Sequence, residues 1–418
     1  MNIIKSTGTF SFYTLISRIS GYLRDILIAI FLGSGPVADA FFVAFRIPNT
    51  FRRLFGEGSF NAAFVPSYSK ELVKGKKKTE NFANNIFNLL TIFLLALVLL
   101  VELFMPFFVS LIAPGFKSNP EKFALATQLT KITFPFILFV SLASFFSAIL
   151  NSHNRFAAAS AAPIILNLVM IGILVFGKIL GEKLVIFLSY GVSIAGFIQA
   201  FFLAIFVKRF FEPKLKFNFN ISKNVKLFFK KLLPSIFSSG VTQINILVGT
   251  IIASFQANAV SYLYYADRIY QINLAIAGIA IGTVILPNLS RYIKKGNDKK
   301  IDFIQNKSFE LCLFLSLPAS MALIVGSEQI TSALFGYGAF DAYSVSNSAK
   351  ALYYFALGLP AFAIIKVFST FLFARNNTKS PFYYSLISVL INISISIIFF
   401  QKIGFIIIPI ATTISSWF

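Results

Sequence analysis

The chain has 418 residues, of which 57% are hydrophobic and only 12% are charged, and its mean hydropathy is +0.80. This composition excludes an ordinary soluble domain, in which about 25% of residues are charged. The formal charge of +22 comes with no zinc-finger spacing and no aromatic RNA-binding signature, so we expect no nucleic-acid partner. Cys312 and His153 are the sole residues of their types, which excludes a Cys/His metal site, a disulfide and a Ser-His-Asp triad.

Apolar windows near the length that spans a bilayer core, about 20 residues, recur along the whole chain. They predict an all-α integral membrane protein with twelve transmembrane helices, near residues 10–32, 37–66, 86–113, 124–150, 157–177, 184–206, 232–255, 260–289, 304–334, 346–373, 381–400 and 404–418. The first window lacks a small-residue cleavage site, so we interpret it as a retained helix and not as a signal peptide. The twelfth is too short to cross the membrane comfortably.

The loops between these helices test the map, because cytoplasmic loops collect Lys and Arg. The even-numbered loops hold 21 such residues and the odd-numbered loops hold 5. This alternation predicts a multi-pass membrane protein with a cytoplasmic N-terminus. The longest polar loop, 208–231, is a basic cytoplasmic linker in this interpretation, and it separates an N-terminal lobe (1–207, helices 1–6) from a C-terminal lobe (232–418, helices 7–12).

An internal repeat supports the two lobes. At an offset of about 221, residues 65–66 and 69–70 of the second helix and its loop match residues 286–287 and 290–291 of the eighth helix and its loop. With one residue of slippage, 46–47 also match 268–269. Six helices separate the two copies, so both have the same orientation, and transporters built in this way place their substrate path between the halves.

Charged residues inside the first, second and eighth helices are the main functional signal, because each costs at least about 2.5 kcal/mol at mid-membrane. They are Arg18, Arg24, Asp25, Asp39, Arg46, Arg52, Arg53, Glu57, Asp267 and Arg268. Pro48, which lacks a backbone donor, is expected to kink or break the second helix. The simpler alternative is that the arginines pair with the four carboxylates and hold helices together. Basic residues outnumber acidic ones, however, and this surplus favours an anionic ligand, with arginine suited to phosphate.

With these residues in view, the sequence resembles the MurJ/MviN family, the lipid II flippases of the multidrug/oligosaccharidyl-lipid/polysaccharide exporter superfamily. The resemblance rests on blocks at residues 17–18, 21, 24–25, 38–45, 48–49, 52–53, 57–58, 60, 63–66, 131–135, 148–151, 264–268, 282–283 and 286–287. It implies a non-enzymatic, cofactor-free transporter that moves the undecaprenyl-diphosphate-linked peptidoglycan precursor from the cytoplasmic to the outer leaflet by alternating access. The implied partners are lipid II and the bilayer, with other cell-wall synthesis proteins as candidates, and the implied state is a monomer.

The same resemblance implies roles for individual residues. Arg18, Arg24, Arg52 and Arg268 match family positions that line a central cationic cavity and hold the diphosphate and sugar head group. Gating or orienting roles fall to Asp25, Asp39, Asn49, Arg53, Glu57 and Asp267. Family members usually have fourteen helices, whereas this sequence stops in the twelfth, as in a fragment or in a lineage without the last pair.

Two other functions remain open from the sequence. One is another transporter of the same superfamily, either a flippase for a different lipid-linked oligosaccharide or a cation-coupled drug exporter. A drug exporter of cations would need acidic residues in its cavity, and the surplus of basic residues opposes this. The other is a polytopic membrane enzyme acting on polyprenyl phosphates, although the paired Asp residues of a metal site are missing and His153 stands alone. No ATP-binding motif is present, so the energy source stays undetermined between membrane potential, an ion gradient and downstream consumption.

Overall fold

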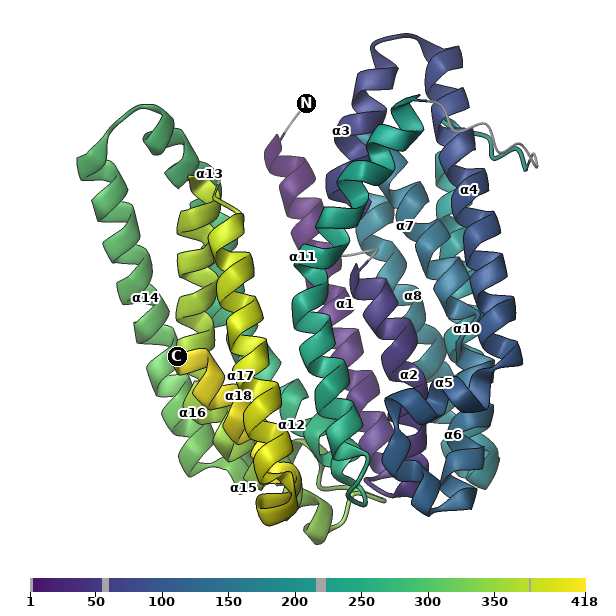
Figure 1. The fold of residues 1–418 in the computed structure, drawn as a ribbon, viewed down its shortest axis with the longest axis vertical. Coiled ribbons are helices and arrows are strands. Elements are labelled where there is room, and N and C mark those ends of the chain that lie inside the picture. Colours follow the sequence, from purple (N-terminus) through teal and green to yellow (C-terminus); the bar gives the residue numbers. More distant parts are fainter. Residues whose placement is uncertain (1–2, 55–59, 216–222, 376) are drawn as a thin grey trace. The chain divides into compact units, whose positions relative to one another are not determined.

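The computed structural model describes residues 3–54, 60–215, 223–375 and 377–418, and these form helices joined by turns, with no strand among them (Figure 1). The chain divides into two compact units. Unit 1 contains residues 1–31 and 40–243, and unit 2 contains residues 32–39 and 244–418. The boundary therefore lies inside a helix at 243/244, whereas the sequence analysis placed the end of the linker at 231.

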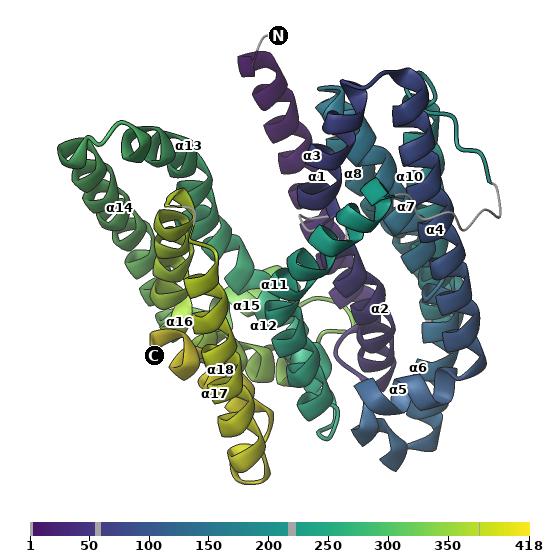
Figure 2. The same cartoon turned by 45° about the horizontal axis from the view of Figure 1, so that its top comes forward.

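Unit 1 is built around α7, against which several other helices pack. Its helices are α1 (Ile3–Leu32), α2 (Pro36–Leu54), α3 (Phe60–Leu72), α4 (Lys76–Leu103), α5 (Met105–Ile112), α6 (Pro120–Thr133), α7 (Phe136–Ser152), α8 (Phe156–Val175), α9 (Gly177–Leu180), α10 (Leu184–Val207) and the first part of α11 (Lys223–Ala253). Helices α7, α8 and α10 lie side by side, and the short α5 continues from the end of α4 (Figure 2). Phe60, Phe64 and Phe145 form an aromatic core that Phe228 of α11 completes.

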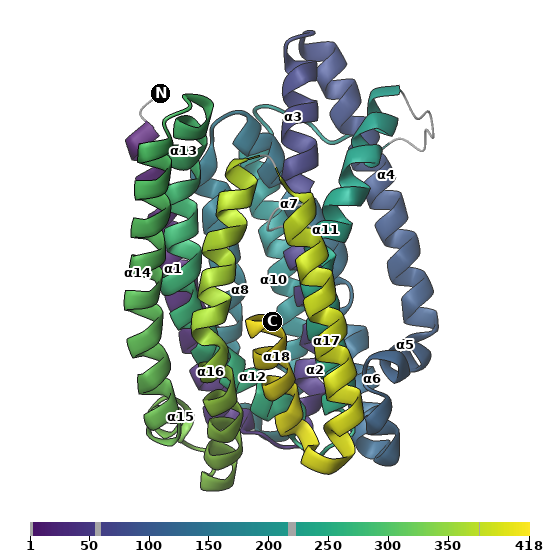
Figure 3. The same cartoon turned by 60° about the vertical axis from the view of Figure 1, so that its left-hand side comes forward.

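Unit 2 is organised around α16. Besides the end of α11, it contains α12 (Ala259–Leu274), the π-helix η4 (Ala275–Ala280), α13 (Ile281–Lys294), α14 (Asp298–Val325), α15 (Ser327–Phe335), α16 (Ala342–Ala374), α17 (Lys379–Ile403) and α18 (Ile407–Trp417). After a turn at Gly404, α18 runs back along α17, where Ser388 donates to the Ser415 carbonyl at 2.7 Å (Figure 3). Helices α12, η4 and α13 follow one another without a break and pack on α16.

The helix map from the sequence is only partly tested. Eight helices of the described residues are long and apolar enough to cross a membrane, and one of these, Lys379–Trp417, joins the predicted eleventh and twelfth helices. The structure separates that pair at Gly404. Three predicted helices, 86–113, 124–150 and 304–334, are each interrupted, at Phe104, at residues 134–135 and at Gly326. The count of twelve stays a prediction.

Pro48 does not break the second helix, and this part of the prediction was wrong. Helix α2 continues through Pro48 to Leu54. The proline has no N–H for the carbonyl of Ala44 four residues earlier, and the hydroxyl of Thr133 on α6 donates to that carbonyl at 3.0 Å. Because all three residues are buried, this hydroxyl replaces the missing backbone donor in a place that water does not reach.

The same arrangement recurs in unit 2. Pro360 lies inside α16 and leaves the carbonyl of Ala356 without its helical donor. The hydroxyl of Ser320 on α14 donates to that carbonyl at 2.6 Å. Each unit therefore tolerates a proline in a long helix because a neighbouring helix supplies the hydrogen bond.

The turn between α1 and α2 depends on Gly33. Its φ of +61° lies in the left-handed region, and a Cβ at this position would lie 2.3 Å from the carbonyl oxygen of Ala339. Only glycine meets both conditions without strain. Gly35, two residues later, has open space around its Cβ position.

We therefore expect Gly33→Ala to destabilise the protein by about 2 kcal/mol or more, because it combines the left-handed backbone penalty with a steric clash. Thermal unfolding of the detergent-solubilised protein measures the effect. Gly35→Ala in the same turn is the matched control and should change stability by less than about 0.5 kcal/mol. Equal unfolding temperatures for the two variants would contradict this account of Gly33.

Candidate functional site

Arg24 of α1 is buried together with the carboxylate that follows it. The guanidinium donates twice to Oδ1 of Asp25, from Nη2 at 2.7 Å and from Nε at 3.1 Å. Only 5% of Arg24 and 2% of Asp25 are exposed. At this depth a lone charge is very costly, so the pair stabilises both ions. Arg24 is therefore paired with a carboxylate, as the simpler alternative from the sequence expects, but both residues lie on α1, so this pair does not itself hold two helices together.

Asn167 of α8 links this pair to a second helix. Its Oδ1 accepts a hydrogen bond from Nη1 of Arg24 at 2.9 Å, and its Nδ2 donates to the carbonyl of Ser17 at 2.9 Å. Gly21 allows this approach, because a Cβ there would already touch the Asn167 amide at 3.4 Å. The sequence analysis did not single out Asn167, although an amide in an otherwise apolar helix was a usable signal.

Arg18, six residues earlier on α1, differs from Arg24. Its side chain is exposed and makes no hydrogen bond or ion pair with the described part of the chain. The structure therefore brings Arg24 and Asp25 together and leaves Arg18 outside that pair. As a long cation in an apolar helix, Arg18 needs a counter-charge or water.

Helix α2 carries a second polar group near its end. The Nε of Arg52 donates to Oδ1 of Asn49 at 3.1 Å, one turn apart on the same helix. Arg46 and Arg53 are half-buried. These side chains extend the basic character of unit 1 beyond α1. Glu57, which the sequence analysis also named, lies outside the described residues.

Arg268 and Asp267 lie on α12 in unit 2, and both are half-buried. Nη2 of Arg268 donates to the hydroxyl of Tyr264 at 2.9 Å, and the guanidinium carbon lies 4.8 Å from the centre of that ring. Asp267 accepts a hydrogen bond from the side-chain amide of Gln271. Both charges are thus supported by partners one turn away on their own helix.

Asp39 makes the most buried polar contact in unit 2. Its Oδ1 accepts hydrogen bonds from the backbone N–H of Ser261 at 2.8 Å and from the Ser261 hydroxyl at 2.5 Å. Ser261 lies in the first turn of α12, where backbone N–H groups have no helical acceptor. The fully buried carboxylate therefore caps a helix that begins 220 residues after it in the chain. We call this contact the Asp39 cap.

Other contacts surround the Asp39 cap and hold the turn 32–39 within unit 2. The hydroxyl of Tyr265 donates to the carbonyl of Gly33 at 2.9 Å, and the hydroxyls of Ser34 and Ser344 lie 2.5 Å apart. The start of α12, the start of α16 and this turn therefore meet at one end of unit 2. No group of three metal-ligating His, Cys, Asp or Glu side chains occurs among the residues that the structure describes.

The amino-acid sequence is similar to known proteins along nearly its whole length. The family model "Lipid II flippase MurJ" matches residues 28–418. A probable lipid II flippase MurJ from Rhizobium meliloti is 41% identical, with coverage of 100% of this chain and 79% of that protein. The corresponding protein of Rickettsia prowazekii is 37% identical, with coverage of 100% and 82%.

Solved structures agree with this similarity. A structure of lipid II flippase MurJ in an inward closed conformation matches with a TM-score of 0.87 at 30% identity, covering 98% of this chain and 85% of that one. A multidrug resistance MATE transporter in an inward-facing conformation matches with a TM-score of 0.77 at 15% identity, covering 96% and 91%. The latter likeness shows a shared fold alone.

The Asp39 cap gives a direct prediction. Asp39→Ala leaves the buried N–H of Ser261 without an acceptor, so we expect a loss of about 1–3 kcal/mol of stability. Thermal unfolding in detergent measures it, and Asp39→Asn should lose less because the amide oxygen still accepts.

Asp341 provides a matched control, because it caps α16 with the same geometry, accepting from the Ser344 N–H at 2.8 Å and from its hydroxyl at 2.5 Å. These hydrogen bonds hold the pKa of the exposed Asp341 carboxyl below its usual range. Asp341→Ala should cost only about 1 kcal/mol, since water can replace the exposed carboxylate. If Asp341→Ala costs as much as Asp39→Ala, the burial of Asp39 is not what makes its cap important.

Proposed function

Because the chain belongs to the MurJ family of lipid II flippases, we infer that it moves lipid II, the lipid-linked peptidoglycan precursor, across the bacterial inner membrane. The resemblance stated from the sequence is confirmed by the family match over residues 28–418 and by relatives at 37% and 41% identity. The chain is a multi-pass membrane protein of the transporter type, and we propose that it has no catalytic centre of its own. The arginines within its apolar helices carry the assignment to an anionic substrate.

We propose that Arg18, Arg24, Arg52 and Arg268 bind the diphosphate and sugar head group. A guanidinium offers two parallel donors to two phosphate oxygens and stays charged in an apolar surrounding. Arg18 is exposed and free of carboxylates in the described chain, which supports it as a ligand. Arg52 donates to Asn49 and Arg268 donates to Tyr264, and such hydrogen bonds orient a guanidinium on its own helix.

Arg24 has a different place in the proposal, since Asp25 occupies two of its donors. A phosphate oxygen that replaces the carboxylate would preserve the charge balance of the buried guanidinium. Asp25 would then act as an orienting partner that is exchanged for substrate. Asp39 would act as a gating residue through the Asp39 cap, and Asn49, Arg53, Glu57 and Asp267 would orient their neighbours.

The orientation in the membrane is also a proposal. The excess of Lys and Arg in the even-numbered loops supports a cytoplasmic N-terminus. Transport would then run from the cytoplasmic to the outer leaflet by alternating access of two six-helix lobes. A monomer suffices for this mechanism, and other cell-wall synthesis proteins are candidate partners.

Growth of a strain depleted of its own lipid II flippase tests the four arginines. Loss of a charged hydrogen bond to the substrate weakens binding about ten- to a hundredfold, so each of Arg18→Ala, Arg24→Ala, Arg52→Ala and Arg268→Ala should fail to restore growth at wild-type expression. The matched control is Arg209→Ala, which removes an exposed arginine after the end of α10. Full rescue by all four variants, relative to the wild-type chain, would overturn the binding assignment.

Cysteine labelling tests the orientation. The native Cys312 is buried, so reaction with a membrane-impermeant maleimide should report an introduced cysteine with little background. Lys178→Cys should react in intact spheroplasts, and Lys77→Cys, also exposed but on the proposed cytoplasmic side, only after lysis. The reverse labelling pattern would contradict the proposed orientation, and with it the proposed direction of transport.

A further inference from the structure

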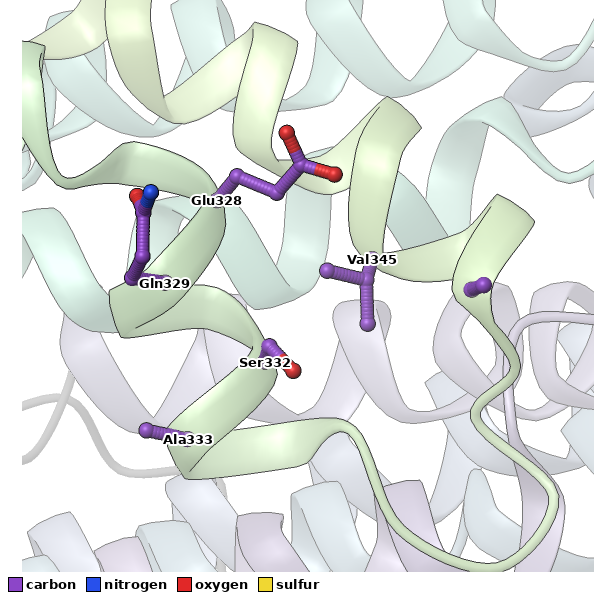
Figure 4. Close-up of a pocket in the computed structure, with 6 residues that line it drawn as sticks. Glu328, Gln329, Ser332, Ala333 and Val345 are labelled. Carbon is purple, nitrogen blue, oxygen red and sulfur yellow. The ribbon is translucent and has the colours of Figure 1, made fainter.

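A groove between α15 and the first turns of α16 is not used by the proposed transport mechanism. Two adjoining cavities of about 440 and 230 Å³ form it, and both are lined by Glu328. Figure 4 shows Glu328 and Ser332 of α15 and Val345 of α16 pointing into the same space. The groove lies wholly within unit 2.

The groove holds one acidic and one basic side chain that are both exposed and do not pair. Glu328 lines both cavities, and Lys350 of α16 lines the smaller one. Neither makes an ion pair or hydrogen bond with the described residues of the chain. By contrast, Lys307 and Glu310 on the surface of α14 pair with each other at 2.7 Å. A carboxylate and an ammonium that do not pair with each other are suited to a ligand that carries a positive and a negative group at separate positions.

Neutral donors complete the polar lining. Ser346 and Tyr353 lie in the same cavity as Lys350, and Ser332 and Gln329 lie in the other. A phosphate beside Lys350 could therefore accept hydrogen bonds from two hydroxyls as well as from the ammonium. A primary ammonium beside Glu328 could donate to the carboxylate and to the side-chain oxygen of Gln329.

The depth of the groove in the membrane indicates where such a ligand comes from. Helix α16 has 33 residues, which makes it about 50 Å long and longer than the bilayer core of about 30 Å. Lys350 lies about 12 Å from its first residue, which is near the head-group boundary of a helix centred in the bilayer. Tyrosine is enriched in membrane proteins at the level of the head groups, and Tyr353 lies less than one turn after Lys350 on α16.

Exposed apolar side chains continue from the groove towards the membrane core. On α16, Tyr353 and Leu357 are each 38% exposed, one turn apart. On the adjacent α14, Met321 and Val325 are 58% and 77% exposed. These side chains offer an acyl chain a surface that begins where the polar groove ends.

We propose that this groove binds a zwitterionic phospholipid whose head group carries a primary ammonium and a phosphate, as in phosphatidylethanolamine. Glu328 binds the ammonium, Lys350 binds the phosphate, and the exposed side chains of α14 and α16 contact an acyl chain. An anionic lipid would pair with Lys350, but its negative charge would lie near the carboxylate of Glu328 and be repelled by it. In the orientation proposed above the lipid belongs to the outer leaflet, although the binding chemistry does not depend on that orientation.

Lipid titration of the purified full chain, followed by native mass spectrometry, tests the proposal. We expect dioleoyl phosphatidylethanolamine to occupy the protein more than the phosphatidylcholine or phosphatidylglycerol with the same chains. Glu328→Gln and Lys350→Gln should each weaken that binding about three- to tenfold, the range for one partly exposed charged contact. Lys350→Arg should retain most of it. Glu310→Gln, which removes a carboxylate on the surface of the same unit, is the control and should leave it unchanged.

Three results would overturn the proposal. The first is equal binding of the three lipids to the wild type, and the second is unchanged phosphatidylethanolamine binding by Glu328→Gln with a wild-type unfolding temperature. The third is displacement of the lipid by a soluble zwitterionic dipeptide at equal concentration, which would make the groove a peptide site. Transport failure of the arginine variants does not affect this test, because lipid binding is measured directly.

Discussion

The need to satisfy every backbone polar group without water is the constraint on which both units depend. A buried N–H or carbonyl in an apolar surrounding costs several kcal/mol when it has no partner. The chain nevertheless places prolines inside α2 and α16, and Thr133 and Ser320 donate to the two carbonyls that lose their helical partner. The Asp39 cap solves the equivalent problem at a helix start, because its carboxylate accepts the first-turn N–H of Ser261.

The charged side chains within the apolar helices also have partners within the protein, but to different degrees. Arg24 and Asp25 neutralise each other at full burial, while Arg52 donates to Asn49 and Arg268 donates to Tyr264. Arg18 is exposed and unpaired within the described chain. In the proposed function an anion can approach Arg18 directly, whereas at Arg24 it must first replace the carboxylate of Asp25.

Sequence reasoning identified the helical membrane fold and the family, because hydropathy and short motifs are properties of single segments. It also pointed to the arginines within the apolar helices, whose role in binding stays a prediction. Contacts between residues that lie far apart in the sequence could not be predicted in this way. Asp39 was visible as a buried acid, but nothing near it in the sequence points to Ser261 as its partner. Pro48 was expected to kink or break the second helix, because the sequence does not show that Thr133 on another helix replaces the missing donor. The groove of Glu328 and Lys350 was missed for the same reason, since its two charges lie on different helices.

The hydroxyls that serve the proline helices also fix how neighbouring helices are aligned along their axes. Thr133 reaches the one carbonyl on α2 that Pro48 leaves open, and Ser320 does so for Pro360 on α16. A shear of one helical turn, about 5.4 Å, would leave that carbonyl unpaired and bring the hydroxyl beside a carbonyl already bonded. Sliding of α2 past α6, or of α14 past α16, is therefore penalised, and each pair is expected to move through the transport cycle as one rigid body.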